Sequence, residues 1–85
     1  MTDRPTVYYH TAAWCAPCKQ LKPRVQKLCR DLEVEMRILD VDKDAPVVGG
    51  FTSVPAVAVF WPNRPDPLVL VGQTLTIATL RKALS

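Results

Sequence analysis

The first third of the chain has the hydrophobic and polar pattern of one strand followed by one helix. Residues 6–11, Thr-Val-Tyr-Tyr-His-Thr, are rich in β-branched and aromatic side chains, which favour a strand. Apolar side chains then recur at steps of four, three, one and three residues, the spacing of one helix face: Leu21, Val25, Leu28, Cys29 and Leu32. This spacing predicts a helix over residues 16–31. Pro23 lies inside it and removes one backbone hydrogen bond, so we expect a kink there.

The rest of the chain predicts three more strands. Residues 35–42 alternate, with Met36, Ile38, Leu39 and Val41 expected inward. Residues 56–61 are continuously apolar, as in a buried central strand, and residues 68–71 form the last strand. Residues 62–67, with three prolines, predict a turn between these two strands.

Two further helices are expected in the same part of the chain. A short one covers residues 44–50, with Pro46 in its first turn and Gly49-Gly50 at its end. The other is spaced by Ile77, Leu80 and Leu84, with Thr76 as its N-cap. The order is therefore β-α-β, a short helix, then β-β-α. It predicts an α/β fold with a mixed four-stranded sheet and helices on both faces.

Length and composition limit the classes of protein. With 85 residues and 48% hydrophobic side chains, the chain forms one domain, residues 1–85, and is not disordered. No apolar run approaches the roughly 18 residues of a membrane helix. Because the start, Met-Thr-Asp-Arg-Pro-Thr, has no apolar stretch behind it, we expect no secretory signal and a cytoplasmic protein. We also expect a monomer that does not associate with membranes.

The net charge of +3 is concentrated in one segment, which holds Lys19, Lys22, Arg24, Lys27 and Arg30. The simplest interpretation is the solvated face of a helix, and the alternative is a surface for acidic partners. No aromatic residues interleave with these cations, so nucleic-acid binding is not expected.

Two of the three cysteines form a Cys15-x-x-Cys18 pair, which in a cytoplasmic protein indicates redox or metal chemistry. Placed where the first strand meets the first helix, their α-carbons are near the distance that a disulfide requires. The positive end of the helix dipole and nearby Lys19 favour a thiolate. We assign Cys15, which is nearer the open end, as the nucleophile and Cys18 as the resolving thiol.

Cys29 lies eleven residues after Cys18, roughly 16 Å along a helix, so it is interpreted as a core residue. The same distance argues against a zinc site formed by the three cysteines and His10, and we expect no metal.

The segment Trp14-Cys15-Ala16-Pro17-Cys18 resembles the active site of the thioredoxin family, Trp-Cys-Gly-Pro-Cys, with Ala16 in place of the glycine. The resemblance extends to Pro23, to Val54-Pro55 at the family's cis-proline loop, and to the stretch 39–42, Leu-Asp-Val-Asp. Phe60 and Gly72 also fall near family positions. The resemblance implies a thioredoxin fold and a protein-disulfide reductase with no cofactor beyond a redox-active Cys15–Cys18 disulfide.

The resemblance also implies how substrates bind. Disulfide-containing proteins would pair with the backbone of Val54-Pro55. The side chains expected to contact them are those of Trp14, Ala16, Pro17 and Gln73. A thioredoxin reductase or glutathione would return the electrons.

The sequence departs from the family in two respects. Thioredoxins carry a buried aspartate five residues before the tryptophan, a position held here by Tyr9, next to a His10 expected to be buried and neutral. The family's N-terminal strand and helix have no counterpart, which brings the length closer to glutaredoxin. A glutathione-dependent, glutaredoxin-like reductase is therefore the alternative, although the motif is not Cys-Pro-Tyr-Cys. A non-catalytic thioredoxin-fold module is weakened by the presence of both cysteines.

Overall fold

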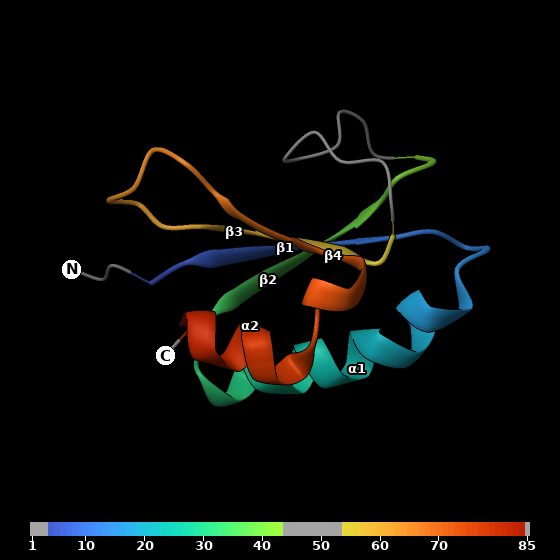
Figure 1. Ribbon diagram of the computed structural model, residues 1–85, viewed down its shortest axis with the longest axis horizontal. Coiled ribbons are helices and arrows are strands. Elements are labelled where there is room, and N and C mark those ends of the chain that lie inside the picture. Colours follow the sequence, from blue (N-terminus) through green and yellow to red (C-terminus); the bar gives the residue numbers. More distant parts are fainter. Residues whose placement is uncertain (1–3, 44–53, 85) are drawn as a thin grey trace.

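Four strands form one mixed sheet in the computed structural model, which describes residues 4–43 and 54–84 (Figure 1). The strands are β1 (Thr6–Thr11), β2 (Glu35–Asp40), β3 (Ala56–Phe60) and β4 (Leu68–Val71). Their order across the sheet is β2-β1-β3-β4. Strand β1 runs parallel to β2 and antiparallel to β3, and β4 returns antiparallel to β3. The mixed four-stranded sheet predicted from the sequence is confirmed.

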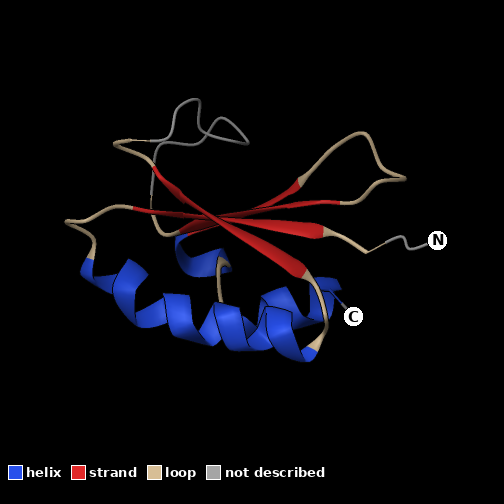
Figure 2. Ribbon diagram, turned by 180° about the vertical axis from the view of Figure 1, so that it is seen from behind, coloured by secondary structure: helices blue, strands red, loops and turns tan. Residues whose placement is uncertain are grey.

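Both described helices, α1 (Ala16–Asp31) and α2 (Ile77–Leu84), cover the same face of the sheet (Figures 1 and 2). The 3-10 helix η1 (Gly72–Thr74) connects β4 to α2. The helix expected over residues 44–50 lies outside the described residues, so a helix on the second face stays a prediction. Within residues 4–43 and 54–84, no helix is both long enough and apolar enough to cross a membrane.

Two strands end earlier than the sequence pattern predicted. After β2, the amide of Asp42 donates to Asp40 Oδ1 at 2.8 Å and the amide of Lys43 to the Asp40 carbonyl at 3.0 Å, which turns the chain. After β3, the Trp61 carbonyl accepts from the amide of Arg64 at 3.2 Å and begins the connection to β4. The expectation that Ile38 is a core residue is also wrong, although it pairs with the core residue Tyr9 in the parallel register. Ile38 is 38% exposed because β2 is an edge strand.

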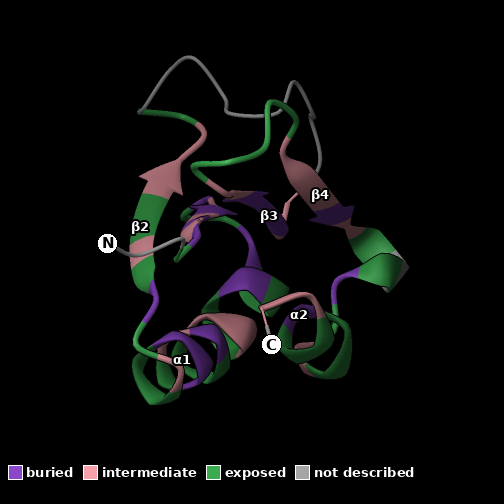
Figure 3. Ribbon diagram, turned by 90° about the vertical axis from the view of Figure 1, so that its left-hand side faces the viewer, coloured by how far each residue is buried: buried purple, intermediate pink, exposed green. Residues whose placement is uncertain are grey.

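The hydrophobic core fills the space between the sheet and the two helices (Figure 3). Its fully buried side chains come from β1, β3 and both helices and include Val7, Tyr9, Val57, Val59, Val25, Leu28 and Leu80. Cys29 belongs to this core, as the helix spacing predicted. The core fixes α1 against β1, and this contact places the cysteine pair at the end of the sheet.

The helix ends explain two local features. The Thr76 hydroxyl accepts from the Thr79 amide at 3.0 Å, so the predicted N-cap of α2 is confirmed. Helix α1 ends in a Schellman motif, in which the Val34 amide donates to the Cys29 carbonyl at 2.8 Å. In that motif Glu33 adopts a φ of 56°, a left-handed conformation that glycine adopts at lower cost.

Candidate active site

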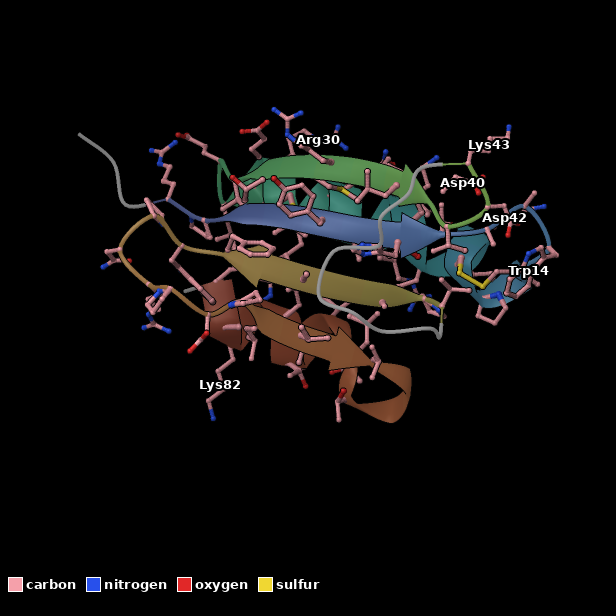
Figure 4. All side chains as sticks on the ribbon, turned by 90° about the horizontal axis from the view of Figure 1, so that it is seen from above. Trp14, Arg30, Asp40, Asp42, Lys43 and Lys82 are labelled. Atoms are coloured by element: carbon pink, nitrogen blue, oxygen red, sulfur yellow. A yellow bond between two sulfur atoms is a disulfide. The ribbon has the colours of Figure 1, made fainter. Side chains whose placement is uncertain are left out.

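Cys15 and Cys18 are joined in a disulfide at the junction between β1 and α1, with their α-carbons 5.3 Å apart. A turn closed by the Cys15 amide and the Ala12 carbonyl, 3.1 Å apart, carries the chain from the strand into the helix. Figure 4 shows the disulfide at one end of the sheet, beside Trp14. The two cysteines are therefore placed where the sequence spacing predicted them.

Cys15 is the N-cap of α1, with extended backbone dihedrals. Its Sγ accepts a hydrogen bond from the Cys18 amide at 3.2 Å, in the manner of a capping side chain. A sulfur at this position faces the positive end of the helix dipole, and no acidic residue lies in the first turn. Both effects stabilise a thiolate more than a thiol, which is the condition for a reactive cysteine.

Apolar side chains enclose the disulfide. Ala12 is buried against the cysteine pair, and Val41 and Val54 pack on the same cluster. Cys15 is 4% exposed and Cys18 is fully buried. Cys15 is the more accessible of the two, as expected, but the margin is small because these neighbours cover both sulfurs.

Trp14 is the most exposed large hydrophobic side chain of the described residues, at 68%. Its indole Nε1 donates to Asp42 Oδ2 at 2.9 Å, so the residue after β2 and the residue before Cys15 meet at the same end of the sheet (Figure 4). The sequence did not predict this contact between Trp14 and Asp42, although Asp42 belongs to the stretch Leu-Asp-Val-Asp at residues 39–42.

Tyr9 occupies the space beneath the first turn of α1. The side chain is fully buried, and its hydroxyl donates to the Cys18 carbonyl at 2.7 Å. Burial raises the pKa of Tyr9 to about 12, so the hydroxyl stays protonated at neutral pH. Tyr9 therefore acts as a neutral hydrogen-bond donor to the backbone of Cys18. His10, on the same strand, is also fully buried, and burial lowers its pKa, as expected for a neutral histidine.

The remaining residues predicted to bind substrate lie around the same end of the sheet. Ala16 and Pro17 are exposed, and Val54 and Pro55 are half-buried. The peptide bond between Val54 and Pro55 is cis. Gln73 is in η1, but its side chain is outside the described part of the structure.

Pro17 and Pro55 share the lining of a cavity of about 360 Å³. The first turn of α1 and the Val54-Pro55 segment therefore face a common space beside the cysteine pair.

The residues considered for a zinc site do not come together. Cys15 and Cys18 are bonded to each other, whereas Cys29 is in the main core. Across the described ranges, 4–43 and 54–84, no three His, Cys, Asp or Glu side chains are grouped as metal ligands would be.

Comparisons with known proteins agree with this geometry. The thioredoxin family model matches residues 1–82. The H-type thioredoxin of Chlamydomonas reinhardtii is 34% identical over 84 residues, which covers 93% of this chain and 74% of that protein. The thioredoxin of Borreliella burgdorferi is 35% identical over 74 residues, which covers 82% of this chain and 62% of that protein. The chain thus spans less than two thirds of the bacterial protein.

A solved structure supports the fold as well. The thioredoxin of Fasciola hepatica superposes with a TM-score of 0.80 at 25% identity, covering 98% of this chain and 80% of that chain.

Proposed function

Because this chain belongs to the thioredoxin family, we propose that it reduces disulfide bonds of other proteins with a dithiol formed by Cys15 and Cys18. The observation that carries this proposal is the pair itself. The two cysteines are at disulfide distance, with Cys15 Sγ accepting from the Cys18 amide at the N-terminus of α1.

In the proposed reaction the Cys15 thiolate attacks one sulfur of the substrate disulfide. A bond forms between Cys15 Sγ and that sulfur, and the second substrate sulfur leaves as a thiolate. Cys18 then loses its proton and attacks Cys15 Sγ. This step closes the Cys15–Cys18 disulfide and releases the first substrate sulfur. Two electrons have moved from the dithiol to the substrate, and an external reductant must restore them.

Proton removal from Cys18 is the step in which this site differs from the family pattern. Tyr9, with a pKa of about 12, cannot accept a proton at neutral pH. Asp42 already accepts the Trp14 Nε1 proton in a hydrogen bond. We therefore assign the proton acceptor to water, with the carboxylates of Asp40 and Asp42, which lie at the same end of the sheet as Trp14, as the alternative acceptors (Figure 4).

Substrates are proposed to dock on the surface around the cysteine pair. The exposed ring of Trp14 and the side chains of Ala16 and Pro17 supply one wall, and Gln73 is assigned to the opposite side. An extended substrate segment would pair with the backbone of Val54-Pro55, which is the usual way an extended peptide is held beside a strand.

The identity of the electron donor distinguishes a thioredoxin-like reductase from the glutathione-dependent, glutaredoxin-like alternative. We propose a thioredoxin reductase as the electron donor, because the motif is Trp-Cys-Ala-Pro-Cys rather than Cys-Pro-Tyr-Cys. We propose the cytoplasm as the compartment, since the third cysteine, Cys29, is a free thiol.

The test is a recycling assay with insulin as the disulfide substrate and NADPH as the final reductant. Turnover with thioredoxin reductase is expected, and it should be abolished by Cys15→Ser. Turnover only with glutathione and glutathione reductase would establish the glutaredoxin-like alternative. Equal activity of the wild type and the Cys15→Ser variant would overturn both.

A further inference from the structure

Helix α1 is strongly basic, and the proposed reaction does not use most of that charge. Its sequence holds five lysines and arginines and one acid, Asp31. Lys27 pairs with Asp31 at 2.9 Å, whereas no ion pair of Arg24 is found among the described residues. Arg24 and Lys27 both line a second cavity that also includes Asp31, but of the five cations of α1 only Arg24 also lines the cavity shared by Pro17 and Pro55.

Among the residues that the structure describes, Arg24 is the only charged one in the lining of the 360 Å³ cavity beside the cysteine pair. Most of that lining is apolar, and Gln20 is its one other polar side chain; the principal members are Pro17, Leu21, Pro55, Leu75, Gln20 and Arg24. The described lining of the cavity therefore presents one cation and one amide against apolar walls, and it contains no carboxylate that would neutralise the cation. A guanidinium in such surroundings matches a carboxylate, which it can bind through two parallel hydrogen bonds.

The position of Arg24 on α1 determines how far a substrate side chain bound there would lie from Cys15 Sγ. Nine helical residues separate it from Cys15, a rise of about 13 Å at 1.5 Å per residue. An extended substrate advances about 3.3 Å per residue, so the same distance corresponds to three or four substrate residues. A segment held at Val54-Pro55 would pass Pro55, which lines the cavity, before reaching Arg24.

We propose that Arg24, assisted by Gln20, forms a specificity subsite for an aspartate or glutamate of the substrate, three or four residues from its reacting cysteine. The subsite rests on the proposed disulfide reductase function and adds a substrate preference to it. Arg24 binds substrate away from the reacting sulfurs, so it changes the rate of the first attack by Cys15 and leaves the resolving step unaltered.

The test compares peptides that carry one cysteine as a mixed disulfide with thionitrobenzoate. Each peptide has glutamate or glutamine at the third or fourth position before or after the cysteine. Attack by the pre-reduced protein on the peptide sulfur releases the coloured thionitrobenzoate, so stopped-flow absorbance gives the second-order rate constant. For one of these positions the glutamate peptide is expected to react about two- to fivefold faster than its glutamine partner, the range that exposed ion pairs reach.

Two variants and one high-salt measurement test whether the preference comes from the charge of Arg24. Arg24→Gln should bring the glutamate-to-glutamine ratio to about one. Arg30→Gln removes the same charge from the same helix but lies away from Trp14 and the disulfide (Figure 4), so it should keep the wild-type ratio. Sodium chloride at about 1 M should remove the preference in the wild type, because the screening length then falls to about 3 Å.

A ratio near one at every position in the wild type would overturn the subsite. The same conclusion follows if Arg24→Gln keeps the preference or if Arg30→Gln loses it to the same extent. If no peptide reacts with the reduced protein at all, the disulfide reductase function itself fails, and the subsite fails with it.

Discussion

Replacing Tyr9 with phenylalanine removes one hydroxyl from the centre of the molecule and leaves the ring in place. In the wild type this hydroxyl donates to the Cys18 carbonyl at 2.7 Å, and both residues are fully buried. Water cannot replace the lost donor without opening the contact between β1 and α1. A buried acceptor that loses its donor costs about 1–3 kcal/mol, and a typical net hydrogen bond contributes about 1 kcal/mol. We therefore expect Tyr9→Phe to lower the free energy of unfolding by about 1.5 kcal/mol.

The measurement is urea denaturation of the oxidised protein, supported by thermal unfolding. For a domain of this size 1.5 kcal/mol corresponds to a fall in Tm of about 6–12 °C. Tyr8→Phe is the matched control, because it deletes a hydroxyl from the adjacent residue while keeping the edge-to-face contact of that ring with Phe60. No hydrogen bond of the Tyr8 hydroxyl is found among the described residues, so this variant should change stability by less than about 0.5 kcal/mol.

The effect of Tyr9→Phe should also be local to the first turn of α1. The peptide group that contains the Cys18 carbonyl also contains the Lys19 amide, which donates to the Cys15 carbonyl at 3.4 Å. Losing the Tyr9 donor frees this peptide group, so the Lys19 amide should exchange its hydrogen faster than in Tyr8→Phe. Equal stability and equal exchange in the two variants would refute the idea that Tyr9 holds the cysteine-bearing turn.

Three further changes test other parts of the structure. Tyr9→Asp should lower stability by a few kcal/mol, because it replaces a buried, hydrogen-bonded ring with a small polar side chain, and should speed the resolving step at neutral pH by supplying a base. Urea denaturation and stopped-flow reduction check the two effects, and Tyr9→Asn should also lose stability but should not speed the resolving step. Cys29→Ala should keep turnover and cost about 1 kcal/mol at neutral pH. Burial raises the pKa of Cys29 from 9.0 to about 11, so the thiol ionises first in the unfolded chain. The wild type should therefore lose about 2 kcal/mol of stability as the pH rises from 9 to 11, and alkaline denaturation curves that fall equally in Cys29→Ala would contradict this. Glu33→Gly should raise the free energy of unfolding by about 1 kcal/mol, because glycine adopts the φ of 56° at lower cost. Glu33→Ala removes the same exposed ion pair with Arg4 but should give no gain, and a gain in both variants would show that the backbone conformation is not the cause.

The parts of the fold that could be predicted from the sequence are those set by local patterns. The six β-forming residues of β1 and the apolar spacing of α1 gave the correct bounds for both elements. The predicted start of the helix at residue 16 put Cys15 directly before its first turn, and the structure shows Cys15 as the N-cap. Ile38 was misjudged because alternation identifies a face of a strand but not whether the strand lies at the edge of its sheet.

The contacts around the site could not be predicted, because they join residues far apart in the chain. Trp14 meets Asp42 across 28 positions, through the parallel pairing of β1 and β2. The resemblance to the family implied that Tyr9 stands at the family's acid position. Only the packing of β1 against α1 shows that its hydroxyl reaches the Cys18 backbone. Likewise, the basic residues of α1 form one cluster in the sequence, and of these only Arg24 lines the cavity shared by Pro17 and Pro55.

The central claim is that Cys15 attacks the substrate and Cys18 releases it, and trapping the intermediate tests this most directly. The Cys18→Ser variant, reduced and mixed with a disulfide substrate, should accumulate a covalent adduct, because the second thiol is absent. Peptide mapping by mass spectrometry should place that adduct on Cys15, and Cys15→Ser should form none at a comparable rate. An adduct on Cys18 in the Cys15→Ser variant, formed as fast as the wild type reacts, would contradict the assignment of the nucleophile.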